Sequence, residues 1–125
     1  MLNNILIYIS SIIIIIWGVA HIIPTKSVVA GYGEISRDNK LIFMMEWIAE
    51  GTALIFVGVL TLLINILNGY QNPVSLNVFR ISAAMLIIMA ILTAFTGART
   101  KVVFFKICPF IKTFGAVLLL LAVYL

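Results

Sequence analysis

The sequence predicts an all-α integral membrane protein, a four-helix bundle that forms one transmembrane domain over residues 1–125. The composition is the first observation, because 64% of the residues are hydrophobic and 10% are charged, whereas soluble domains carry about 25% charged residues. The second observation is that the apolar residues fall into four stretches, each near the roughly 20 residues that one helical crossing needs. We expect the spans at about residues 5–23, 41–66, 76–96 and 103–124.

The first span is expected to be a helix of the mature chain rather than a signal peptide. The segment before it, residues 1–4, has no positive charge, and no small-x-small cleavage site follows. Its β-branched run, residues 12–16, would favour a strand in water, but a lone segment in lipid must satisfy its own backbone as a helix. After Pro24, residues 25–30 are expected to form a short helix at the membrane surface, which Gly31 ends.

The second span carries two acidic residues in an otherwise apolar helix. We expect Asp38 or Asn39 to cap its start. Glu46 and Glu50 are four residues apart, so they share one helix face at a separation of about 6 Å along the axis. Each carboxylate costs about 2.5–3.5 kcal/mol in a membrane helix on insertion scales. This cost makes the pair the first candidate for a functional site.

The last two spans are separated from their neighbours by short polar loops. Residues 68–73 form a turn-rich, uncharged loop, and residues 97–101 form a basic one. Pro109 suits the first turn of the last helix, where its missing N–H costs nothing. A span that began at Pro109 would be short for a membrane crossing, so residues 102–105 are expected to lengthen it within the membrane.

Small residues and tryptophans give further expectations about packing. Gly51 and Gly58 lie seven residues apart on one helix stripe and could seat a neighbouring helix, as could Gly115 in the last span. Trp17 and Trp47 are expected to be anchors at the membrane interface, where tryptophan is enriched, and the alternative is that they are platforms for a substrate.

The basic residues predict the orientation. Loops one and three hold almost all of them, namely Lys26, Arg37, Lys40, Arg99, Lys101 and Lys106. The positive-inside rule therefore places these loops in the cytoplasm and both termini outside, in a multi-pass protein of the cell membrane. Arg80 is the exception, and it is close enough to the outer surface to extend its side chain there. The net charge of +4 thus indicates topology, and no basic face with interleaved aromatic residues suggests nucleic-acid binding.

This topology places most of the intramembrane polar residues at one depth, in the cytoplasmic half. The candidate pocket residues are His21, Glu46, Glu50, Thr93, Thr96, Arg99 and Lys112. One interpretation is a polar pocket open to the cytoplasm, in which the two carboxylates share a proton and the imidazole moves protons near neutral pH. The other is a structural one, in which the acids pair with Lys112, Arg99 or His21 to hold the helices together.

No metal or other cofactor is predicted. The chain has one histidine, no HExxH motif, and no Glu-x-x-His partner for the Glu46–Glu50 pair. Cys108 is the only cysteine, which excludes an intramolecular disulfide. It lies at the expected start of the last span near Lys106 and Lys112, where a thiolate would be favoured, or it is an inert small residue in a packed loop.

Four spans in 125 residues, with Gly18-Val19-Ala20-His21 at the end of the first, resemble small DoxX-like membrane proteins. The acid-bearing second span, with Glu46 and Glu50, fits that resemblance loosely. It implies a four-helix membrane fold and roles in redox-associated complexes or as a membrane chaperone, and it implies no catalytic residue.

Three functions remain open from the sequence. The first is a binding or accessory protein that holds a lipid, a small apolar ligand or a partner subunit at the polar pocket. The second is a transporter coupled to protons or cations through Glu46 or Glu50, which would need a homo-oligomer because four short helices enclose little volume. The third is a membrane enzyme in which a carboxylate and His21 carry out acid–base chemistry on an apolar substrate.

Overall fold

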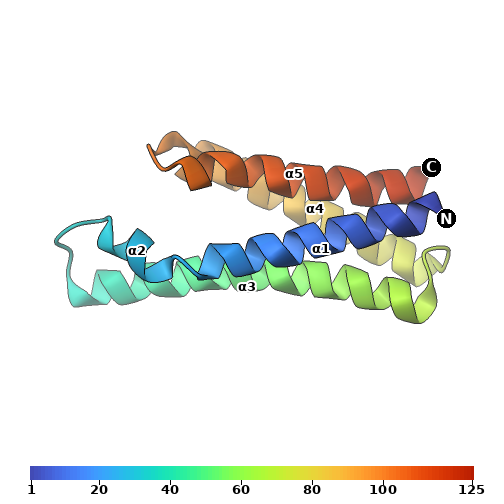
Figure 1. Ribbon diagram of the computed structural model, residues 1–125, viewed down its shortest axis with the longest axis horizontal. Helices are drawn as coiled ribbons and strands as arrows, with labels where there is room; N and C mark the ends of the chain where they lie inside the picture. Colours follow the sequence, from blue (N-terminus) through green and yellow to red (C-terminus); the bar gives the residue numbers. More distant parts are fainter.

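The computed structural model describes all 125 residues and confirms the all-α prediction. Four long helices, α1 (Leu2–Ile22), α3 (Arg37–Asn68), α4 (Pro73–Phe95) and α5 (Val103–Tyr124), form an antiparallel bundle (Figure 1). All four are long and apolar enough to cross a membrane. Two short elements lie at one end, the helix α2 (Thr25–Ala30) and the 3₁₀ turn η1 (Gly97–Arg99). Both chain termini lie at the opposite end (Figure 1).

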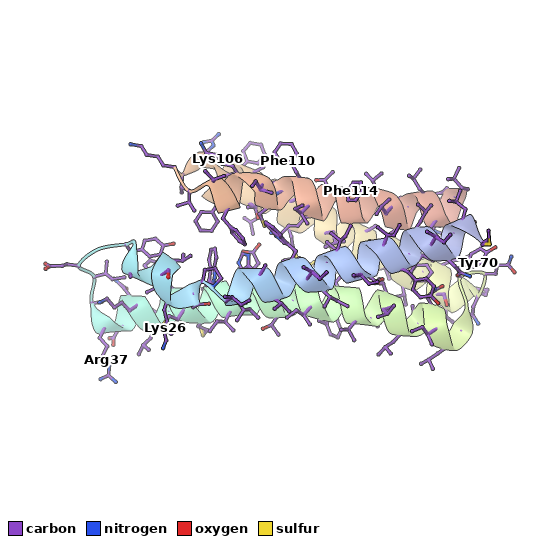
Figure 2. All side chains as sticks on the ribbon, in the orientation of Figure 1. Lys26, Arg37, Tyr70, Lys106, Phe110 and Phe114 are labelled. Atoms are coloured by element: carbon purple, nitrogen blue, oxygen red, sulfur yellow. The ribbon has the colours of Figure 1, made fainter.

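The outer surface of the bundle is apolar, as a lipid-facing surface must be. Large hydrophobic side chains such as Phe56, Leu92 and Phe110 are more than half exposed, and Phe110 and Phe114 point away from the bundle (Figure 2). The interior is a layer of fully or nearly fully buried residues from all four helices. Its main members are Ile7, Ile14, Leu54, Phe79, Leu86, Ala116 and Leu119.

Several helix boundaries differ from those expected. The third residue of α3 donates its backbone N–H to the Ser36 hydroxyl, so Ser36 is the cap and the prediction of Asp38 or Asn39 was wrong. The prediction that Pro109 occupies the first turn was also wrong, because α5 begins at Val103 and Pro109 lies in its second turn. Proline has no N–H to donate, so the Phe105 carbonyl loses its helical partner at that point. The short helix α2 forms where it was predicted.

Glycines bring α1 and α3 into close contact, as the spacing of Gly51 and Gly58 predicted. A Cβ atom on Gly58 would lie 2.6 Å from Ile15 Cγ1 and 2.8 Å from the Ser11 carbonyl oxygen. A Cβ atom on Gly51 would lie 2.9 Å from the carbonyl oxygen of Gly18. Close approach of this kind lets helices pack in lipid through van der Waals contact. One turn beyond Gly58, the hydroxyls of Ser11 and Thr61 form a hydrogen bond of 2.8 Å across the same interface.

The Gly58→Ala variant tests this close packing. The added methyl group meets backbone, which cannot move without shifting a helix, so we expect a loss of about 1–3 kcal/mol in the free energy of unfolding. The measurement is reversible unfolding in mixed micelles. Gly97→Ala is the matched control, because the nearest heavy atom to its Cβ would be at 3.4 Å. Equal stability of the two variants would contradict the proposed packing.

Candidate functional site

A charged cluster lies inside the bundle near the end that carries α2. Lys112 of α5 is fully buried, and its ammonium group donates hydrogen bonds to Glu50 Oε1 of α3 and to Thr93 Oγ1 of α4, the latter at 2.8 Å. His21, in the last turn of α1, places Nε2 at 3.4 Å from the other carboxylate oxygen, Glu50 Oε2. The cluster therefore joins side chains from all four long helices around one carboxylate.

The periodicity of each helix explains why these side chains meet. His21 continues the buried stripe of α1 that runs through Ile14 and Gly18. Lys112 lies on the buried stripe of α5, one turn after Cys108. Each residue thus occupies a position that its helix turns toward the core, where the ammonium group bonds to Glu50 and Thr93. A buried lysine of this kind requires a paired anion.

Aromatic rings surround the histidine. The Trp47 ring stacks on the His21 imidazole at a centroid distance of 4.0 Å, and its indole N–H donates a hydrogen bond to the His21 carbonyl oxygen. Phe104 stacks on Trp17 at 4.6 Å. The prediction that both tryptophans are interfacial anchors was wrong for Trp47, which is 8% exposed. The sequence offered one signal, since Trp47 is three residues before Glu50 and so shares its helix face.

Cys108 lies in the same interior. Its thiol is fully buried and accepts a hydrogen bond of 3.3 Å from the Trp17 indole N–H. Cys108 is thus enclosed, as one of the two interpretations expected, but it lies within helix α5 and not in a loop.

The remaining residues of the predicted pocket lie apart from the cluster. Thr96 is exposed and donates its hydroxyl to the Leu92 carbonyl oxygen. Arg99 is exposed in η1, with its guanidinium carbon 5.8 Å from the centre of the Phe95 ring. Glu46 is exposed and forms no ion pair. The structure therefore brings together His21, Glu50, Thr93 and Lys112, and leaves the other three outside.

A groove leads from the surface to the cluster. Helices α3 and α4 are joined by a short loop at one end and diverge toward the other, where α2 lies beside α3 (Figure 1). The groove has a volume of about 390 Å³, within the range of small-molecule sites. Its lining is mostly apolar and comprises Val28, Val29, Tyr32, Phe43, Glu46, Trp47, Ala49, Glu50, Met85, Met89 and Leu92.

The two acidic side chains supply the polar part of this groove. The Glu50 side chain is 31% exposed, although its partners Lys112 and His21 are enclosed. Glu46 lines the same groove one turn away along α3. An ionised carboxylate only accepts hydrogen bonds, the Tyr32 hydroxyl can donate as well as accept, and no cationic side chain lines the groove. This arrangement suits a ligand whose polar group donates hydrogen bonds.

No family model, no curated protein and no solved structure matches the chain. The resemblance to DoxX-like proteins therefore stays a prediction.

Proposed function

We propose that this protein is a membrane binding protein that takes an amphipathic molecule from the lipid into the groove between α3 and α4. The ligand's apolar body lies against Phe43, Met85 and Leu92, and its head group reaches the carboxylates of Glu46 and Glu50. The single observation that supports this proposal most strongly is the partly exposed carboxylate of Glu50 in an apolar groove, paired on its inner side with a fully buried lysine.

The charge of the groove selects the head group. Glu46 has no partner within the chain, and Lys112 already balances the charge of Glu50. An anionic head group would be repelled by Glu46, whereas a protonated amine would pair with it at low dielectric. The ligand class is therefore a long-chain molecule with a cationic or hydrogen-bond-donating head, and a long-chain amine is the best match.

The orientation that belongs to this proposal has loops one and three in the cytoplasm. Lys26, Arg37 and Lys106 lie at the end of the bundle with α2, and Tyr70 lies at the other end (Figure 2). The basic residues are concentrated at the first end, which supports a cytoplasmic position by the positive-inside rule. The groove then opens in the cytoplasmic half of the membrane.

Fluorescence of Trp47 tests the proposed binding, because this indole lines the groove yet is almost shielded from bulk lipid. The Trp17→Phe variant leaves Trp47 as the sole tryptophan. In vesicles, a brominated long-chain amine should quench its emission saturably, while brominated phosphatidylcholine at the same bromine content should quench weakly. Equal, non-saturating quenching by both would mean that the amine meets Trp47 only as bulk lipid, and the proposal would fail.

A further inference from the structure

A second group of polar side chains lies inside the opposite end of the bundle, where the termini lie. Asn65, in the last turns of α3, is 4% exposed, and neither atom of its side-chain amide has a hydrogen-bond partner in the protein. The fully buried Ser75 hydroxyl, in the first turn of α4, has no partner either. The Asn4 side-chain oxygen in α1 is also buried and without a partner.

The helix register places Asn4 opposite Asn65. Ser11 of α1 meets Gly58 of α3, since the Ser11 carbonyl oxygen lies 2.8 Å from the position of a Gly58 Cβ. Asn4 precedes Ser11 by seven residues and Asn65 follows Gly58 by seven, which is two turns along each antiparallel helix. The loop between α3 and α4 is short, so the first turn of α4, with Ser75, lies at this same end of the bundle (Figure 1).

The chemistry of these atoms identifies what binds there. Leaving a buried amide or hydroxyl without a partner is energetically costly, and several such groups lie at this end of the interior. The amide nitrogen of Asn65 is a donor, while the amide oxygens of Asn4 and Asn65 are acceptors. A bare cation could satisfy only the oxygens and an anion only the nitrogen and hydroxyl. Water both donates and accepts, so it matches the whole set.

A cavity also opens at the surface of this end of the bundle. It has a volume of about 330 Å³, and its lining includes the polar residues Asn3, Tyr70 and Gln71. Asn3 and Leu76 in that lining are the sequence neighbours of Asn4 and Ser75. We propose that Asn4, Asn65 and Ser75 form a hydrated site that binds water drawn from the surface at the end with the chain termini.

The interior between this hydrated site and the charged cluster around Glu50 is dry. On the inner side of Asn65, the hydroxyls of Ser11 and Thr61 bond to each other and need no water. Beyond them the interior is closed by Ile14, Leu54 and Leu86, all at most 1% exposed. The hydrated site and the charged cluster around Glu50 are therefore separate, and the water does not reach Lys112.

Water-edited solid-state NMR on the wild-type protein in lipid bilayers tests the proposal. We would follow magnetisation transfer from water to the ¹⁵N-labelled side-chain amides of asparagine and the backbone amides of serine. The Asn65 side-chain signal, identified by its loss in Asn65→Leu and by sequential correlations, should build up as fast as that of the exposed Asn39. The amide of Ser82, which is buried two turns deeper on the same face of α4 as Ser75, is the control and should build up slowly.

Transfer to the Asn65 side chain at the slow rate of Ser82 would overturn the proposal, because the amide would then lie in a dry interior. Since the readout comes from the wild-type protein and sequential correlations assign the Asn65 signal without the variant, the result does not depend on whether Asn65→Leu folds.

Discussion

The Glu50→Gln variant is expected to lose about 3–5 kcal/mol of unfolding free energy, the range measured when one partner of a buried ion pair is removed. The substitution keeps the size of the side chain but removes its negative charge, so the fully buried Lys112 ammonium is left with two neutral acceptors, the new amide oxygen and the Thr93 hydroxyl. The measurement is unfolding in mixed micelles. Glu46→Gln is the matched control on the same helix face, and we expect a change within about 0.5 kcal/mol because Glu46 has no partner to lose.

A double-mutant cycle separates the ion pair from a general loss of packing. Lys112→Met alone should also destabilise the protein, but less, since Glu50 keeps His21 and is partly exposed. The double variant Glu50→Gln, Lys112→Met should recover most of the loss, because no unpaired charge remains. Additive losses would mean that the two side chains do not interact in the membrane, and the cluster as described would be wrong.

Phenylalanine in place of Ala49 is expected to weaken binding of the brominated amine at least tenfold, while the unfolding free energy stays within about 1 kcal/mol. Ala49 is exposed and lines the groove beside Glu50, so a larger side chain fills space that the ligand needs without disturbing the core. The measurement is the concentration of amine that half-quenches Trp47.

Ile91→Phe is the control for this variant. Ile91 is exposed on α4 but does not line the groove, so the quenching curve should match that of the parent protein. If both substitutions weaken quenching equally, the amine occupies no defined groove.

The fold could be predicted from the sequence because the membrane allows few structures. A chain of four apolar stretches must satisfy its backbone within each stretch, and helices follow. Short polar loops then force neighbouring helices to run antiparallel. The close approach of a neighbouring helix to α3 could also be predicted, because Gly51 and Gly58 remove side chains from one stripe, but the sequence did not identify that neighbour as α1.

The candidate site could be predicted only in part. Depth followed from topology, so His21, Glu50, Thr93 and Lys112 were all placed near one another along the membrane normal. The rotation of α3 about its own axis could not be predicted from topology, because α3 is apolar on almost every side and shows no polar face to orient it. For this reason the sequence could not tell that Glu50 turns inward to Lys112 while Glu46 remains exposed.

The groove could not be predicted, because it depends on how helices diverge, and the only signal for the interior position of Trp47 was the helix face that it shares with Glu50. α4 packs along α5 and moves away from α3 toward the end with α2. Trp47 turns into the space beside His21, whereas its amphipathic ring would also suit the membrane interface. Sequence spacing describes contacts along one helix and contains no direct information on the crossing angle between two.

Photo-crosslinking with a long-chain amine that carries a diazirine in its chain tests the central claim most directly. Wild-type protein in vesicles would be irradiated, digested and mapped by mass spectrometry. If the amine binds as proposed, the labels should be concentrated on four residues of the groove, Phe43, Met85, Met89 and Leu92. An excess of unlabelled amine should abolish this labelling. Labels spread evenly over the lipid-exposed side chains of all four helices, and unaffected by competitor, would contradict binding in the groove between α3 and α4.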